Sequence, residues 1–239
     1  TRSLSQSAEL SDLLAREGAL PLEIPMVEIC PVEDPAELDA ALADLARYDW
    51  IVLASTNAVE AVFARLGELG KDSRGLHGVR VAAIGSATAE ALRLRGIDAD
   101  FVPKEFVSES VVDGLRPMGT AGASVLLPRS DIGREALAQG LTQQGAAVHE
   151  VAAYRTVIPE DSGARLAQCL EQGVDVATFT STSTFRNLGK LLDGDFGRLG
   201  GATVACIGPV TAAAVADAGL TADVVAGEHT APGLLAALV

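Results

Sequence analysis

The chain contains an internal repeat. Residues 81–102 (VAAIGSATAEALRLRGIDADFV) align without a gap with residues 204–225 (VACIGPVTAAAVADAGLTADVV), and about half of the aligned positions are identical. Two further pairs of segments, 49–66 with 175–192 and 1–19 with 128–146, align at nearly the same offset, 123 to 127 residues. A repeat of this length indicates two copies of one structural unit. Two such units that face each other would form a central cleft, which is a usual place for a binding site.

Short apolar runs alternate with helical patterns along the whole chain, which is typical of β/α units built around parallel sheets. The 239 residues suffice for two domains, and the hydrophobic content of 49% comes mostly from Ala, Val and Leu. Glycines at positions 18, 96, 145 and 219 follow helical patterns, and we expect each to end its helix in the left-handed conformation. Strands are predicted near residues 20–24, 50–54, 79–84, 99–102, 124–127, 147–151, 174–179, 203–207 and 223–226.

Two proline-bounded extended stretches lie at equivalent points of the two copies. They predict linkers at residues 26–35 and 152–159, because proline disfavours helix. The residues alone leave two arrangements open, namely tandem domains or a swapped pair in which each copy donates its first strands to the other. A strand at 124–127 precedes Pro128, whereas nothing precedes the matching Thr1, so we expect the sheet with residues 20–24 to lack that strand.

Charge and composition exclude several classes of partner. A formal net charge of −14 argues against binding to nucleic acid or to an anionic membrane surface. Cys30, Cys169 and Cys206 are widely spaced and form no CxxC motif, which favours a reducing cytoplasmic location over a disulfide framework. The three histidines are scattered, so no metal site is expected, and we place all three outside the turns that follow the strands. The sequence contains no run of about 18 apolar residues, so no membrane span is expected.

Four predicted turns between a strand and a helix are rich in hydroxyl or small residues. In open α/β sheets, ligands bind at the carboxyl ends of the strands. A helix start offers free N–H groups and a positive dipole end, which would hold a carboxylate without a cationic side chain. Ser, Thr and Asn are also ordinary helix caps, and this simpler reading applies to each turn taken alone. The turn residues are Ser55, Thr56 and Asn57; Gly85, Ser86 and Thr88; Ser181, Thr182 and Ser183; and Gly208, Pro209 and Thr211.

Neither a GxGxxG fingerprint after a strand nor a P-loop is present, so nucleotide cofactors are not expected. Tyr154, in the second linker, is a candidate hydrogen-bond donor or weak acid, although packing at the domain boundary explains it equally well. Arg2 and Arg129 occupy matching positions after a strand and suit bidentate carboxylate recognition, or else surface ion pairs.

An ordered series of segments resembles the uroporphyrinogen-III synthase family. The segments are VLASTNAVEAVF, AAIGSATAEALRLRGI, the stretch from Pro103 to Ser110, LLPRS with GAAVHEVAAYRT, TFTSTSTFRNL, ACIGPVTA and AGEHTAPGL. They run through nearly the whole chain, and the set is specific although each segment alone is weak.

The resemblance implies two flavodoxin-like α/β domains with swapped connectivity, joined by a two-stranded linker. One domain would contain residues 1–25 and 160–239, and the other residues 36–151. It implies cyclisation of hydroxymethylbilane to uroporphyrinogen III, with inversion of ring D and loss of water, by a monomer without cofactor or metal. It places family hydroxyl positions on Thr88 and Thr211, serine turns on Ser55 and Ser181, and the linker tyrosine on Tyr154. Ser108 falls in the resembling stretch after Pro103 and is a further candidate for substrate binding.

A second class of function stays open at this point. A non-catalytic two-lobed module that binds or senses a small anion would use the same strand-end turns. The products formed from hydroxymethylbilane discriminate between the two hypotheses.

Overall fold

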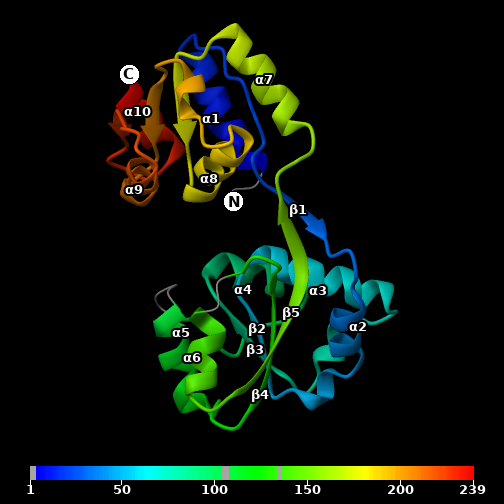
Figure 1. Ribbon diagram of the computed structural model, residues 1–239. Helices are drawn as coiled ribbons and strands as arrows, with labels where there is room; N and C mark the ends of the chain where they lie inside the picture. The colour runs from blue at the N-terminus through cyan, green and yellow to red at the C-terminus, as the bar shows by residue number, and fades with distance from the viewer. Residues whose placement is uncertain (1–3, 104–107, 134–135) are drawn as a thin grey trace. The chain divides into compact units, whose positions relative to one another are not determined.

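The computed structural model describes residues 4–103, 108–133 and 136–239. The chain divides into two compact units: unit 1 contains Thr1–Glu28 and Val157–Val239, and unit 2 contains Ile29–Thr156. The chain therefore passes from one unit to the other twice. The crossings lie at β1 (Glu28–Pro31) and at the end of β5 (Ala147–Val157), and these two strands are neighbours in one sheet (Figure 1).

Unit 2 is built on a five-stranded sheet with the strand order β1-β5-β4-β2-β3. The central strand β2 (Trp50–Leu53) pairs in parallel with β3 (Arg80–Ala83) and with β4 (Ser124–Ser130), and β4 pairs in parallel with β5. All four residues of β2 are buried, as expected for a strand covered on both faces. Parallel pairing brings the carboxyl ends of β2, β3 and β4 to one edge of the sheet.

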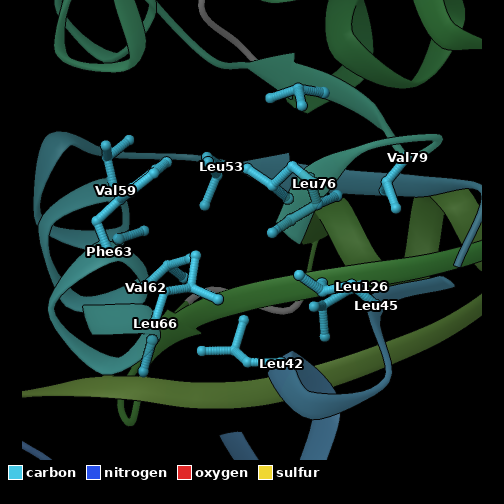
Figure 2. Packing of buried hydrophobic residues seen from close by; sticks show 14 of the residues in the cluster. Leu42, Leu45, Leu53, Val59, Val62, Phe63, Leu66, Leu76, Val79 and Leu126 are labelled. Carbon is cyan, nitrogen blue, oxygen red and sulfur yellow. The ribbon is translucent and has the colours of Figure 1, made fainter. Parts of the chain in front are cut away.

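Alternate residues of β2 enter two separate cores. Ile51 and Leu53 pack against helices α2 (Ala36–Ala43), α3 (Thr56–Glu68) and α4 (Ser86–Arg93). Trp50 and Val52 pack on the opposite face, against α5 (Ser108–Leu115) and α6 (Ala136–Gln143). Figure 2 shows the first core, in which Val59, Val62 and Leu66 of α3 face the strands. The remaining elements of unit 2 are short 3-10 helices, η1 (Leu45–Arg47), η2 (Ser73–Leu76) and η3 (Arg116–Met118).

Unit 1 contains a three-stranded parallel sheet with the order β6-β7-β8 among the described residues. Its strands are β6 (Val176–Phe179), β7 (Thr203–Cys206) and β8 (Val224–Val225). One face is covered by α7 (Ser162–Gln172), α8 (Thr182–Leu191) and α9 (Pro209–Asp217), with η4 (Phe196–Leu199) at the end of α8. The other face is covered by α1 (Leu4–Arg16) and α10 (Ala231–Leu238). Among the described residues, no strand pairs with the outer edge of β6 in the way that β4 pairs with β2 in unit 2.

The predicted helix ends are confirmed. Gly18, Gly96, Gly145 and Gly219 all have φ between 77° and 92°, a conformation that costs glycine little. Two strand predictions are wrong. Residues 99–102 form a single bridge, between Ala82 and Phe101, and residues 20–24 form no strand. The strand predicted at 147–151 continues to Val157, so β5 includes most of the second predicted linker.

In both units, an aspartate side chain accepts a hydrogen bond from an N–H group of the strand that precedes it, β3 in unit 2 and β7 in unit 1. The Val81 N–H donates to Asp100 Oδ2 at 2.7 Å, and the Asp100 N–H donates back to the Val81 carbonyl at 2.8 Å. In unit 1 the Val204 N–H donates to Asp223 Oδ2 at 2.8 Å, and the Asp223 N–H donates to the Val204 carbonyl at 2.9 Å. The carboxylate thus replaces one backbone acceptor beside the strand.

Replacement of Asp100 or Asp223 by Ala is expected to lower the free energy of unfolding by about 1 kcal/mol, because the strand N–H loses a charged acceptor at an accessible site. Asn is the matched control, since its side-chain oxygen still accepts the bond. Urea titration followed by circular dichroism measures the difference. Equal stability of the Ala and Asn variants would contradict this account.

Leu66→Ala is expected to cost about 2–5 kcal/mol, because Leu66 is fully buried in the core of Figure 2 and its truncation leaves a cavity. Leu69→Ala, at the exposed end of the same helix, is the control and should cost less than about 1 kcal/mol. Both are measured by urea titration. A loss for Leu66→Ala no larger than that of the control would show that this core does not stabilise unit 2.

Candidate functional site

The carboxyl edge of the unit 2 sheet begins with the turn after β2. Ser55 is the N-cap of α3, and its Oγ accepts a hydrogen bond from the Ala58 N–H at 3.1 Å. Thr56 and Asn57 form the first turn of the helix and are half-buried. Their N–H groups belong to the first turn of α3, which has no helical acceptor for them. The capping interpretation of Ser55 is therefore correct, and it leaves N–H donors beside it.

Tyr154 reaches the same turn from β5. Its phenol oxygen lies 3.1 Å from Ser55 Oγ, and either hydroxyl is able to donate. The ring is partly buried against the core that contains Val151 and Ala153. The Tyr154 carbonyl accepts from the Asp131 N–H at 3.0 Å, which fixes the backbone beside the end of β4. The structure thus brings two predicted residues, 99 positions apart in the chain, into direct contact.

The turn after β3 has a different form. Gly85 precedes α4 with φ 104°, a left-handed conformation that favours glycine, and no side chain caps this helix. Ser86 is exposed at the first helical position. Thr88 is only 3% exposed, and its hydroxyl donates to the Ile84 carbonyl at 3.1 Å. The Thr88 hydroxyl is therefore occupied within its own helix, while Gly85 and Ser86 present backbone N–H groups at the edge.

Arg129, near the end of β4, already has a counter-ion. Its Nε lies 2.7 Å from Glu150 Oε2, and its Nη1 donates to the Gly133 carbonyl at 2.5 Å. Both side chains of the ion pair are partly buried. The charge that the sequence assigned to carboxylate recognition is thus offset by Glu150.

The turn after β6 in unit 1 repeats the serine cap. Ser181 Oγ accepts from the Thr184 N–H at 3.2 Å and lies 3.0 Å from Ser183 Oγ. Thr182 extends to the next turn, where its hydroxyl lies 3.5 Å from the Val210 carbonyl oxygen. Ser181 and Ser183 therefore bring their hydroxyls together at the start of α8, whereas the Thr182 hydroxyl lies against the turn after β7.

The turn after β7 has the same form as the turn after β3, with a glycine before a helix that no side chain caps. Gly208 is buried and precedes α9, which has no side-chain cap. Pro209 is exposed at the first helical position, and Thr211 is 4% exposed. Like Thr88, Thr211 turns its side chain into the unit rather than toward solvent.

One residue at this edge was missed. The ring of His229 lies against Gly208, so the prediction that all histidines fall outside the strand-end turns is wrong. The sequence separates the two residues by 21 positions, and only the pairing of β7 with β8 brings them together. His149 lies elsewhere, with Nδ1 2.5 Å from the phenol oxygen of Tyr48.

For two of the predicted site residues, the structure gives no description of the side chain. Arg2 lies outside the described residues, and Ser108 is the first residue of α5, with no description of its side chain. Among the described residues, no group of three His, Cys, Asp or Glu side chains is arranged to hold a metal ion. No helix in the described part of the chain is long and apolar enough to cross a bilayer.

Two surface hollows of the described part of the chain lie away from these turns. One of about 280 Å³ is lined by residues of α8 and α9, including Phe185 and Asp217, and one of about 190 Å³ lies between α7 and residues 22–24. Neither is lined by a predicted site residue. Burial raises the pKa of the Cys169 thiol, beside the second hollow, and also that of the Cys206 thiol. Both thiols are therefore poorly suited to act as nucleophiles.

Comparison with known proteins gives one consistent family. The family model described as "Uroporphyrinogen-III synthase HemD" matches residues 8–236. The chain is 37% identical to the uroporphyrinogen-III synthase of Synechococcus elongatus, over all of this chain and 92% of that protein. It is 31% identical to a putative uroporphyrinogen-III synthase of Methanothermobacter thermautotrophicus, over all of this chain and 95% of that protein.

Solved structures agree on the fold. A uroporphyrinogen III synthase mutant from Thermus thermophilus aligns with a TM-score of 0.69 at 20% identity, over 99% of this chain and 94% of that chain. The Helicobacter pylori enzyme aligns with a TM-score of 0.61 at 19% identity, over 88% of each chain. None of these relatives supports the alternative of a non-catalytic anion-binding module. The chain belongs to the uroporphyrinogen-III synthase family.

Proposed function

We propose that this protein cyclises hydroxymethylbilane to uroporphyrinogen III, with inversion of ring D and loss of one water. The family match supports the reaction, and the contact between Tyr154 and Ser55 at the carboxyl edge of unit 2 is the structural observation that carries it. The substrate is a small-molecule polycarboxylate, and we further propose that the enzyme works as a cytoplasmic monomer and requires no cofactor.

The four strand-end turns supply the proposed carboxylate contacts. In each unit one turn is capped by a serine, Ser55 or Ser181, and the other begins with an uncapped glycine, Gly85 or Gly208. The first-turn N–H groups of α3, α4, α8 and α9 lack helical acceptors, and a helix N-terminus favours a negative charge. These donors allow a protein of net charge −14 to bind a substrate with eight carboxylates.

The matching caps also support an internal duplication. Ser55 corresponds to Ser181, and the bond between Val81 and Asp100 corresponds to that between Val204 and Asp223, at the offsets of the sequence repeat. We propose that the units are two flavodoxin-like copies with swapped connectivity, with β1 and β5 as a two-stranded linker and a central cleft lined by both carboxyl edges.

Tyr154 is the proposed catalytic residue. Its phenol donates a proton to the departing hydroxyl of the hydroxymethyl group, which leaves as water and gives a protonated azafulvene. The substituted carbon of ring D attacks this electrophile, and the resulting spiro intermediate rearranges to the inverted macrocycle. The phenolate recovers the proton that the closing ring releases. Ser55 orients the phenol, since the Ser55 hydroxyl is itself fixed by the Ala58 N–H.

The proposal is tested by the isomer of the product. The protein is incubated with freshly made hydroxymethylbilane, and the type I and type III isomers are separated after oxidation. The type I isomer forms without enzyme, so a predominantly type III product supports the proposal. The type I isomer alone, with the protein folded, would rule the proposal out.

Tyr154→Phe is expected to lower kcat for the type III isomer by about 10²- to 10⁴-fold, the usual cost of a lost general acid. Ser181→Ala is the comparison and should cost no more than about tenfold, since it removes one neutral hydroxyl and leaves the neighbouring N–H groups. Initial rates of type III formation measure both. Near-normal turnover of Tyr154→Phe would show that the phenol only packs against the core.

Thr88→Val and Thr211→Val are expected to keep kcat/KM within about threefold of the wild-type value, because both side chains are buried. Valine preserves the branched shape of threonine. A tenfold fall in kcat/KM with an unchanged melting temperature would assign these hydroxyls to substrate binding, as the family resemblance suggests.

A further inference from the structure

We propose that His229 is a further substrate-binding residue, whose imidazole donates a hydrogen bond to a substrate carboxylate at the turn after β7. The inference rests on the proposed function and extends its set of contacts. It starts from the position of the imidazole in the loop between β8 and α10, which the sequence did not single out.

The glycine at position 208 leaves room for the imidazole, and its backbone conformation does not demand glycine. Gly208 has φ 179°, an extended conformation open to any residue. A Cβ placed there would lie 2.9 Å from Cδ2 and 3.0 Å from Nε2 of His229. The ring therefore lies directly on the backbone at the start of α9, where the lack of a side chain leaves space for it.

The loop that carries His229 is held on both sides. The Thr230 N–H donates to the Glu228 carbonyl at 2.8 Å, and Thr230 Oγ1 accepts from the Gly233 N–H at 3.1 Å as the cap of α10. A Cβ on Gly233 would lie 2.2 Å from the Glu228 carbonyl oxygen, so the loop packs tightly against that helix. Such packing fixes the backbone that carries His229 before any ligand binds.

The ring is nevertheless free to bind. His229 is exposed, and within the described part of the chain it makes no hydrogen bond or ion pair. A comparison of the turn after β3 with the turn after β7 shows why a hydrogen-bond donor would be useful beside Gly208. Ser86 offers an N–H and a hydroxyl at the first position of α4, whereas Pro209 offers neither at the first position of α9. The imidazole N–H replaces the donors that proline removes.

Steady-state kinetics with hydroxymethylbilane test this role. His229→Ala is expected to raise KM about 3- to 30-fold with kcat within about twofold, since the lost contact is made equally in the bound and transition states. His229→Gln keeps an N–H donor and should recover part of the loss. His77→Ala is the control, because His77 is exposed before β3 at the opposite edge of the other unit.

Gly208→Ala gives a second, structural test. In the wild-type background the new methyl displaces the ring and should raise KM by a similar factor, whereas the Gly208→Ala, His229→Ala double variant should match His229→Ala alone. Unchanged KM for His229→Ala, or additive effects in the double variant, would overturn the inference. Because the wild type is assayed alongside, absence of its type III product would instead overturn the proposed function.

Discussion

The parallel register of the strands determines where the proposed chemistry lies. Trp50 of β2 is paired with Arg80 of β3 and with Val125 of β4, so that Ser55, Gly85 and Arg129 come to one edge. The register of β4 with β5 then brings Tyr154 beside Ser130, within reach of Ser55. A slip of one residue would turn each alternating side chain to the other face. The two cores of unit 2, with Ile51 on one side and Trp50 on the other, prevent that slip.

Several of the site side chains described at the two edges are already engaged in contacts within their own units. Arg129 is paired with Glu150, and the serines are engaged as helix caps. What the turns offer are backbone N–H groups, which are fixed by the helices and cost little to order. In the proposed mechanism, the protein holds the ends of a reactive bilane in place, and restraint of this kind accounts for several kcal/mol of a barrier. In the proposed mechanism, Tyr154 adds the proton transfer that restraint does not provide.

The local features of the fold were predictable from the sequence. A glycine after a helical pattern predicts a left-handed end, and all four such glycines have it, because that choice depends only on neighbouring residues. Apolar runs predicted β2, β3, β6 and β7 for the same reason. Residues 99–102 were misread as a strand, since their pairing with β3 is confined to the single bridge between Ala82 and Phe101. The length of β5 was missed because its second half depends on a distant neighbour, β1.

Site residues were predictable from the sequence only where their place directly after a strand determines their role. Turn residues such as Ser55 and Ser181 were identified because they directly follow a strand. The burial of Thr88, the pairing of Arg129 with Glu150 and the contact of His229 with Gly208 depend on tertiary packing, which residue spacing does not report. The repeat itself was the strongest signal, since it predicted the same caps in both units.

The central proposal is that the carboxyl edges of both units bind one substrate molecule. Amide chemical shifts measured during titration with uroporphyrinogen III under argon test it most directly. The account predicts that the N–H signals of residues 55–57, 85–86, 182–183, 208 and 210 shift together and saturate at one ligand per chain. Shifts confined to the turns of one unit, or saturation of the two edges at different ligand ratios, would contradict it.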